Sequence, residues 1–317
     1  MHEQPSAIVL KAQMILDQVR KAVVGKDAVL LWVLAAILAR GHILLEDIPG
    51  VGKTTMAVAF SRALGLQYNR VQFTPDVLPS DVTGYCVLNQ STGEMVYRPG
   101  AVLCNLFLAD ELNRATSRTQ SALLEAMEEG QVTVDGISHP LPEPFVVIAT
   151  QNPAGAAGTQ LLPDSQIDRF TVRLSLGYPD PKDEVTMLLQ RQGNDPLQQV
   201  QQAVSLQELA QMQRIVADTH VAEEIAAYVV QLVDATRRSE LLLRGASPRA
   251  TLAVTAMAKA VAQLRGRDYV VPKDVQEVLL STVTHRLEVS LKADSQGMDA
   301  RQVLQSLMGK VRAPKLR

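Results

Sequence analysis

Residues 46–54 read Glu46-Asp47-Ile48-Pro49-Gly50-Val51-Gly52-Lys53-Thr54. They follow the apolar run 43–45 and precede the helix-forming run 56–60, which predicts a strand, a glycine-rich turn and a helix. This arrangement is typical of phosphate-binding loops, because successive backbone N–H groups form a nest and the helix N-terminus adds partial positive charge. The residues expected to bind the nucleotide here are Pro49, Gly50, Val51, Gly52, Lys53, Thr54 and Thr55.

Two side chains of this loop have specific expected roles. Lys53 would bring a full positive charge to the phosphates, and Thr54 would bind Mg²⁺ through its hydroxyl group. The usual phosphate-loop pattern has glycine at position 47, where this chain has Asp47. Gly50 and Gly52 leave the backbone bare where phosphate must approach, so we expect the loop to keep its function.

The bulk composition limits the class of protein. The 317 residues are 47% hydrophobic with a net charge of −2, which argues against a dedicated nucleic-acid binder. Cys86 and Cys104 are too few for a zinc site, and the lack of a disulfide framework suggests a reducing compartment. The N-terminus lacks a signal-peptide pattern, and the longest apolar run, residues 28–39, is too short to span a membrane. We therefore expect a cytoplasmic protein.

The first part of the chain, residues 1–180, alternates strand and helix patterns. This alternation predicts a parallel sheet covered by helices on both faces. A capping box of Ser117 and Gln120 is expected to begin one of the helices. The expected strands are 43–46, 68–73, 106–110, 145–150 and 171–176, and the expected helices are 53–64 and 117–129. Two hairpins are expected at 85–98 and 131–139, either as decorations of the sheet edge or as contact surfaces.

The second part of the chain has only helical periodicity. Residues 178–181 read as a linker, and residues 183–290 as an all-helical domain. Ser205 with Glu208 forms a capping box, and Ser247 before Pro248 is typical of a helix start. We expect residues 291–317 to form a solvated C-terminal extension, with a docking element as the alternative.

A second motif follows the apolar run 106–109. Asp110 and Glu111 come at the carboxyl end of this expected strand, where parallel sheets place their ligands. Asp110 would hold Mg²⁺ through water, and Glu111 would orient and deprotonate the attacking water. Two solvated acids at a strand end are the simpler alternative, but the phosphate loop upstream favours hydrolysis.

A third motif ends the expected strand 145–150, in the string Ala149-Thr150-Gln151-Asn152-Pro153. Asn152 could position the attacking water or contact the γ-phosphate without changing the charge. Asn is also common in turns before proline. Its place in an ordered series of three motifs favours the functional role.

Together the three motifs and the helical region after them resemble the AAA+ ATPases, and in detail the MoxR family. The resemblance covers residues 20–290. Besides residues 46–54, the strings that carry it are Gln72-Phe73-Thr74-Pro75-Asp76-Val77-Leu78-Pro79-Ser80-Asp81, Asp168-Arg169-Phe170 and Gly245-Ala246-Ser247-Pro248-Arg249. Asp47 is usual in this family.

The resemblance implies further roles. Asn152 would be the sensor-1 residue, on a strand between those that carry the phosphate loop and Asp110. Arg169 would be the arginine finger that completes a neighbour's site, with Arg114 as a weaker candidate. Arg249 would be the sensor-2 residue at the start of a lid helix, and Gly25 would pass near the adenine. Arg169 could instead form an ordinary surface ion pair with an acid such as Asp168.

The implied protein is an ATP-hydrolysing, Mg²⁺-dependent, chaperone-like remodelling motor. It would assemble into a ring, most often a hexamer, and would pair with a protein carrying a von Willebrand factor A domain. Three rivals stay open: a small-molecule kinase, which needs neither Glu111 nor the lid arginine, a DNA-acting AAA+ ATPase, which the net charge disfavours, and a non-hydrolysing nucleotide switch.

Overall fold

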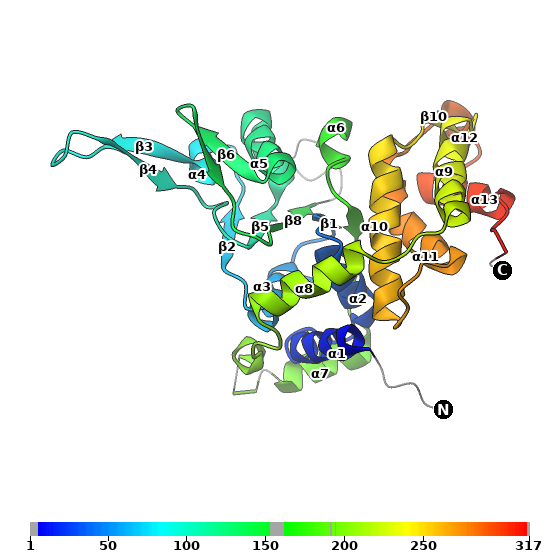
Figure 1. Ribbon diagram of the computed structural model, residues 1–317, viewed down its shortest axis with the longest axis horizontal. Coiled ribbons are helices and arrows are strands. Elements are labelled where there is room, and N and C mark those ends of the chain that lie inside the picture. Colours follow the sequence, from blue (N-terminus) through cyan, green and yellow to red (C-terminus); the bar gives the residue numbers. More distant parts are fainter. Residues whose placement is uncertain (1–5, 153–161, 191, 194, 316–317) are drawn as a thin grey trace.

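A five-stranded parallel sheet organises the protein, with strand order β2-β5-β8-β1-β9 (Figure 1). The computed structural model describes residues 6–152, 162–190, 192–193 and 195–315. The sheet strands are β1 (Ile43–Glu46), β2 (Tyr68–Gln72), β5 (Leu106–Asp110), β8 (Val146–Gln151) and β9 (Val172–Leu174). The strand that carries Asn152 at its end lies between β1 and β5, as expected.

Alternation along the strands divides the core between the two faces of the sheet. Ile43 and Leu45 of β1 belong to a cluster that also contains α1, α2, α3 and the lid helices, whereas Leu44 faces α4 and α5. The same alternation holds in β5 and β8, so both faces are buried, as a parallel sheet requires. The helices of this part are α1 (Ala7–Arg20), α2 (Asp27–Leu38), α3 (Lys53–Ala63), α4 (Pro79–Thr83), η1 (Leu112–Arg114), α5 (Ser117–Glu129) and α6 (Asp164–Ile167).

Both expected hairpins are present and project from the sheet (Figure 1). The first pairs β3 (Gly84–Leu88) with β4 (Met95–Pro99), and the second pairs β6 (Gln131–Val134) with β7 (Ile137–Pro140). The rings of Tyr97 and His139 stack at a centroid distance of 3.7 Å. This contact ties the two hairpins together.

The remaining elements are mostly helices, and those from α9 to α13 form a lid on the other side of the sheet from the hairpins (Figure 1). In order, the remaining elements are α7 (Pro181–Gln190), η2 (Pro196–Gln199), α8 (Leu206–Ala217), α9 (Glu223–Arg237), β10 (Leu242–Arg244), α10 (Pro248–Leu264), α11 (Pro272–Val283), η3 (Thr284–Arg286), β11 (Glu288–Val289), α12 (Leu291–Ser295) and α13 (Ala300–Lys310). In the part of the chain that the structure describes, no helix has the length and apolar character needed to cross a membrane.

Four local expectations need correction. The N-cap of α5 is Thr116, because Thr116 is extended and Ser117 already begins the helix, while Gln120 turns inward to the carbonyl oxygens of Leu112 and Ala115. The linker is shorter than expected, since α7 begins at Pro181. The lid contains a short β10–β11 ribbon besides its helices.

The fourth correction concerns the segment after residue 290. It forms α12 and α13 instead of a solvated extension, because α13 is amphipathic and buries Val303 and Leu304 against the lid. An N-terminal capping box of Asp299 and Gln302 fixes its start. The capping box of Ser205 and Glu208 on α8 is confirmed.

Candidate functional site

The phosphate loop connects β1 to α3 and leaves its backbone accessible. Gly50 and Gly52 have φ angles of 87° and 94°, which residues with a side chain rarely adopt. A Cβ atom added to either glycine would meet no atom within 4 Å. The first N–H groups of an α-helix have no intrahelical partner, and here the space above them is open. This geometry is typical of an anion-binding site.

Lys53, the first residue of α3, lies at the base of the loop and is only 7% exposed. Its Nζ donates to the carbonyl oxygens of Asp47 and Ile48, at 2.8 and 3.1 Å. Burial lowers the pKa of Lys53, while the carboxylates of Asp47, Asp110 and Glu111 act in the opposite direction. A phosphate group would therefore bring a compensating charge to a partly desolvated ammonium group.

Asp47 has a structural role that explains the departure from the usual glycine. Its Oδ2 accepts from the backbone N–H of Leu176 at 2.5 Å, and its Oδ1 accepts from the N–H of Gly177 and the hydroxyl group of Ser175, at 3.1 and 2.8 Å. These bonds attach the phosphate loop to the segment after β9. Where the usual pattern has a flexible glycine, Asp47 therefore fixes the phosphate loop to residues 175–177.

The two acids lie at the end of β5, across from the phosphate loop. Asp110 is 8% exposed, and its Oδ2 accepts from Arg70 Nη2 at 2.7 Å. Glu111 adopts the left-handed conformation with φ 55°, which is uncommon for a residue with a side chain and turns the chain directly after the strand. The Glu111 carboxylate is held at both oxygens, by Asn152 Nδ2 at 3.1 Å and by Arg114 Nη1 at 3.0 Å.

Thr150 of β8 bonds to both acidic residues, and no sequence pattern singles it out. Its buried hydroxyl group donates to Asp110 Oδ1 at 2.7 Å and accepts from the backbone N–H of Glu111 at 2.8 Å. Thr150 lies two positions before Asn152 in the third motif, so two residues near the end of β8 contact the acids of β5. Arg70, in the middle of β2, was also missed, because its strand is three positions away from β1 and only the folded sheet brings it to Asp110.

One cavity is lined by residues predicted to bind phosphate and metal and by the two acidic residues of β5. Its walls are Pro49, Gly50, Gly52, Lys53, Thr54, Thr55, Arg70, Asp110, Glu111 and Asn152. The Thr54 hydroxyl group and the Asp110 carboxylate share this cavity and are oxygen ligands, which Mg²⁺ prefers. The donor set therefore fits Mg²⁺ bound with a nucleotide. Pro153, the last residue of the third motif, lies outside the described residues.

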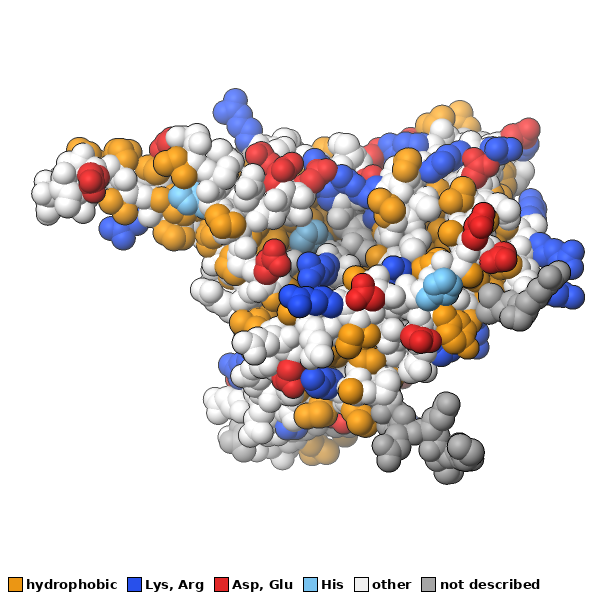
Figure 2. All heavy atoms as spheres, viewed as in Figure 1, with side chains coloured by type: hydrophobic (Ala, Val, Ile, Leu, Met, Phe, Trp, Pro, Cys, Tyr) orange, Lys and Arg blue, Asp and Glu red, His pale blue; other side chains and the backbone are white. Residues whose placement is uncertain are grey.

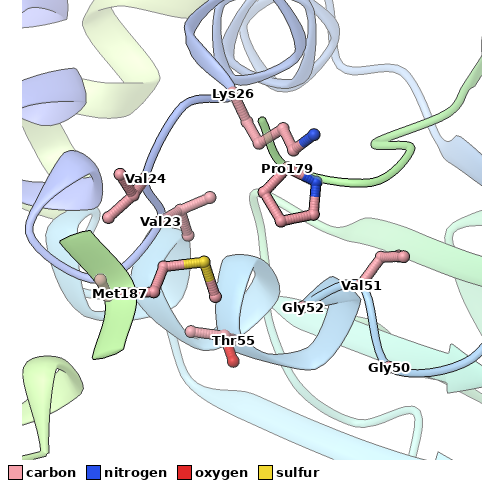
Figure 3. Close-up of a pocket in the computed structure, with 10 residues that line it drawn as sticks. Val23, Val24, Lys26, Gly50, Val51, Gly52, Thr55, Pro179 and Met187 are labelled. Carbon is pink, nitrogen blue, oxygen red and sulfur yellow. The ribbon is translucent and has the colours of Figure 1, made fainter. Parts of the chain in front are cut away.

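A second, more apolar pocket adjoins the phosphate loop (Figure 3). Val23, Val24 and Met187 supply apolar walls beside Gly50 and Thr55, which suits a flat base next to the phosphates. Gly25 is not among the lining residues but lies between two that are. A Cβ atom at Gly25 would come within 1.8 Å of Asp183 Oδ2, so the glycine allows α7 to approach this loop.

Arg169 and Arg249 are absent from the lining of the phosphate cavity and meet at Glu128 of α5 instead. Arg169 Nε donates to Glu128 Oε2 at 2.9 Å, and Arg249 Nη2 donates to Glu128 Oε1 at 2.5 Å. These two bonds, that of Arg169 first, lower the pKa of Glu128. The two arginines therefore belong to one surface, away from the phosphate loop of their own chain. Arg114, in contrast, pairs with Glu111, which lines that cavity.

Comparison with known proteins agrees with this geometry. A family model described as "ATPase family associated with various cellular activities (AAA)" matches residues 42–172, and an AAA lid domain model matches residues 234–307. "Uncharacterized protein YeaC" from Bacillus subtilis is 42% identical, over 94% of this chain and 93% of that protein. "Chaperone MoxR1" from Mycobacterium tuberculosis is 39% identical, over 94% of this chain and 81% of that protein. A crystal structure of a candidate ATPase from Cytophaga hutchinsonii superposes with a TM-score of 0.89 at 36% identity, covering 97% of this chain and 96% of that one.

Proposed function

Because this chain belongs to the MoxR family of AAA+ ATPases, we propose that it hydrolyses ATP with Mg²⁺ and uses the energy to remodel a protein client in the cytoplasm. The observation that carries the proposal is the single cavity shared by Lys53, Thr54, Asp110, Glu111 and Asn152. We propose that residues 1–180 form the nucleotide-binding core with its two hairpins and residues 183–290 the lid, against which α12 and α13 of the C-terminal segment 291–317 pack.

Each residue of the cavity has one task in this mechanism. The loop N–H groups and Lys53 bind the β- and γ-phosphates, and Thr54 and Asp110 hold the metal. Mg²⁺, when bound, neutralises negative charge that develops on the phosphates. Glu111 accepts a proton from the attacking water, and Asn152 keeps the Glu111 carboxylate oriented. Gly25 and its neighbours border the base, on the apolar side of the loop.

The cavity needs a further cation for hydrolysis, and we assign it to a neighbouring subunit. A guanidinium group stabilises charge as it develops on the transferred phosphoryl group. Arg169 and Arg249 lie on one surface with Glu128, so a neighbouring chain could place both at this cavity. We therefore propose a ring, as a hexamer, with Arg169 as the finger and Arg249 as the sensor of nucleotide state. A contact between two different surfaces closes into a ring when the rotation per subunit permits it.

The projecting hairpins are the proposed contact with the client. Leu88, Met95 and Ile137 are 59%, 62% and 61% exposed, and Figure 2 shows hydrophobic side chains along the projecting hairpins. Exposed apolar side chains on a rigid projection are typical of protein-interaction surfaces. The relative "Chaperone MoxR1" supports a protein client, and family membership supports a partner with a von Willebrand factor A domain.

Particle size and hydrolysis, measured together, test the assembly. We expect ATP to shift the protein from a small species to a ring, and Arg169→Ala to lower hydrolysis at least tenfold while ATP still binds. Arg238→Gln is a matched control, since the Arg238 side chain is 80% exposed and, among the residues that the structure describes, pairs only with Asp234 of the preceding helix α9. A monomer that hydrolyses ATP at full rate without Arg169 would contradict the shared site.

A further inference from the structure

The segment that carries Arg169 is short and is held from two sides. Residues 168–171 connect α6 to β9, and Phe170 is fully buried in the core cluster beneath α5. On one side Arg169 contacts Glu128 of α5 and the N–H of Thr171 donates to the carbonyl oxygen of His42, and on the other side the contacts come from the lid. Arg169 itself remains at the surface, with a side chain that is 27% exposed.

Arg286 of η3 makes the most buried of these lid contacts. Its side chain is 2% exposed, and its Nη2 donates to the carbonyl oxygen of Phe170 at 2.6 Å. Its Nη1 lies 3.5 Å from Asp168 Oδ1. His285 Nε2 lies 3.0 Å from the same Phe170 oxygen. A buried guanidinium group is costly unless it is paired, so the placement of Arg286 requires this connection.

Burial lowers the pKa of Arg286 to about 10, with Asp168 acting in the opposite direction. The guanidinium group is therefore charged at neutral pH. The charged guanidinium group lies against Asp168 and donates to Phe170, the two residues that flank Arg169 in the sequence.

Two further lid elements hold the same segment. The Ser247 hydroxyl group, at the start of α10, donates to Asp168 Oδ2 at 2.9 Å rather than capping its own helix. Arg244 of β10 pairs with Asp164 of α6 at 2.5 Å. Three separate parts of the lid thus contact α6 and the connection after it.

We propose that Arg286 is a positioning residue for the arginine finger, so that the lid of one subunit sets the direction in which its Arg169 reaches the neighbour. This inference rests on the proposed function, because it takes Arg169 as the finger. Movement of the lid in one subunit would move the carbonyl group of Phe170 and the carboxylate of Asp168, and Arg169 between them. The state of one subunit thereby controls the rate of hydrolysis in the next.

Mixed assemblies separate this role from general stability. A donor chain carries Lys53→Ala, so its own cavity is inactive while its Arg169 is intact. An acceptor chain carries Arg169→Ala, so its cavity is intact but it supplies no finger. Mixing the two should restore hydrolysis at acceptor cavities that face a donor.

Arg286→Gln is then placed in either chain of the mixture. In the donor we expect at least a tenfold loss of the restored rate, and in the acceptor a change within twofold. Arg286→Lys in the donor, which keeps the charge and one donor group, should recover part of the loss. Arg238→Gln should have no effect in either chain. Equal losses in donor and acceptor, or no loss in the donor, would overturn the proposal.

Two further variants distinguish a failure of the positioning role from a failure to fold and from a wrong choice of finger. If Arg286→Gln does not fold, Ser247→Ala is used instead, because it removes only the hydrogen bonds to Asp168, and a two- to fivefold loss confined to the donor is expected. A donor with both Lys53→Ala and Arg169→Ala should restore nothing. If that donor restores the full rate, Arg169 is not the finger and both proposals fail. If it restores nothing while Arg286→Gln has no effect in the donor, only the positioning role fails.

Discussion

Asn152 Nδ2 donates a hydrogen bond to Glu111 Oε1 at 3.1 Å, across the edge between β8 and β5. Arg114 holds the other oxygen of the same carboxylate at 3.0 Å. A neutral amide can fix the direction of a carboxylate without repelling it, and it can exchange this bond for one to water or phosphate. The relationship makes Asn152 a determinant of the orientation of Glu111.

Replacing Asn152 should therefore affect turnover more than binding. For Asn152→Ala we expect kcat to fall roughly tenfold to a hundredfold, with the affinity for ATP changed less than threefold. Asn152→Asp should be worse, because a second carboxylate beside Glu111 repels it and raises its pKa. Steady-state hydrolysis and binding of a fluorescent ATP analogue measure the two effects. Asn89→Ala, at the turn of the first hairpin, is the control, and equal rates for Asn152→Ala and wild type would contradict the role.

Asp47→Ala should destabilise the protein as well as the loop. It leaves the buried N–H groups of Leu176 and Gly177 without their acceptor, at a cost of about 2–4 kcal/mol in the free energy of unfolding. Asp47→Asn retains one carbonyl acceptor and should cost about half as much. Denaturant unfolding measures both, with the exposed Asp218→Ala as the control. A loss below about 0.5 kcal/mol for Asp47→Ala would show that these bonds do not support the fold.

Gly25→Ala tests the connection between α7 and the base pocket. Its φ of 70° and its close approach to Asp183 should cost about 1 kcal/mol of stability and displace α7. Because Val24 and Met187 line the same pocket, the affinity for ATP should fall several-fold. Gly93→Ala is a matched control, with a φ of 71° but open space around it. Gly93→Ala should lower the stability by a similar amount without lowering the affinity for ATP. Equal ATP affinities for the two variants would show that Gly25 does not influence the nucleotide site.

His42 should make the protein less stable in acid. Burial lowers the pKa of His42 to about 4, and its Nδ1 accepts the backbone N–H of Val147 at 3.0 Å, which only an unprotonated nitrogen can do. In the unfolded chain an imidazole takes up a proton near pH 6.5. The contribution of neutral His42 to the free energy of unfolding is therefore fully present above pH 6.5 and is lost as the pH drops toward 4. The loss from this residue should reach up to about 3 kcal/mol.

Unfolding measured between pH 8 and pH 4 checks this slope. His42→Gln should flatten it without abolishing it, because burial also lowers the pKa of His285. An unchanged slope in His42→Gln would assign the acid sensitivity to other groups.

The parts of the site that could be predicted from the sequence are those formed by contiguous sequence motifs. Residues 46–54 and the pair Asp110 and Glu111 each follow an apolar strand, so their place at the sheet edge follows from alternation and strand direction. The family resemblance implied that β8 lies between β1 and β5, and the structure confirms this placement.

The parts that could not be predicted depend on contacts between distant segments. Arg70 and Asp110 are 40 residues apart, and Glu128 meets Arg249 121 residues further along the chain. Ser247 is the N-cap residue of α10, as predicted, but its hydroxyl group donates to Asp168 instead of accepting from its own helix, a tertiary contact that no local pattern indicates. The amphipathic pattern of α13 was present in the sequence, but its partner surface on the lid exists only in the folded chain.

The hydrolysis rate of Glu111→Gln tests the central claim most directly. Gln keeps the size of Glu111 and can still contact Asn152 and its surroundings, but it cannot accept a proton from water. We expect ATP to bind within threefold of wild type and kcat to fall by about 10²–10⁴, while Glu125→Gln, on the exposed side of α5, leaves both unchanged. Equal hydrolysis by wild type and Glu111→Gln would contradict the account.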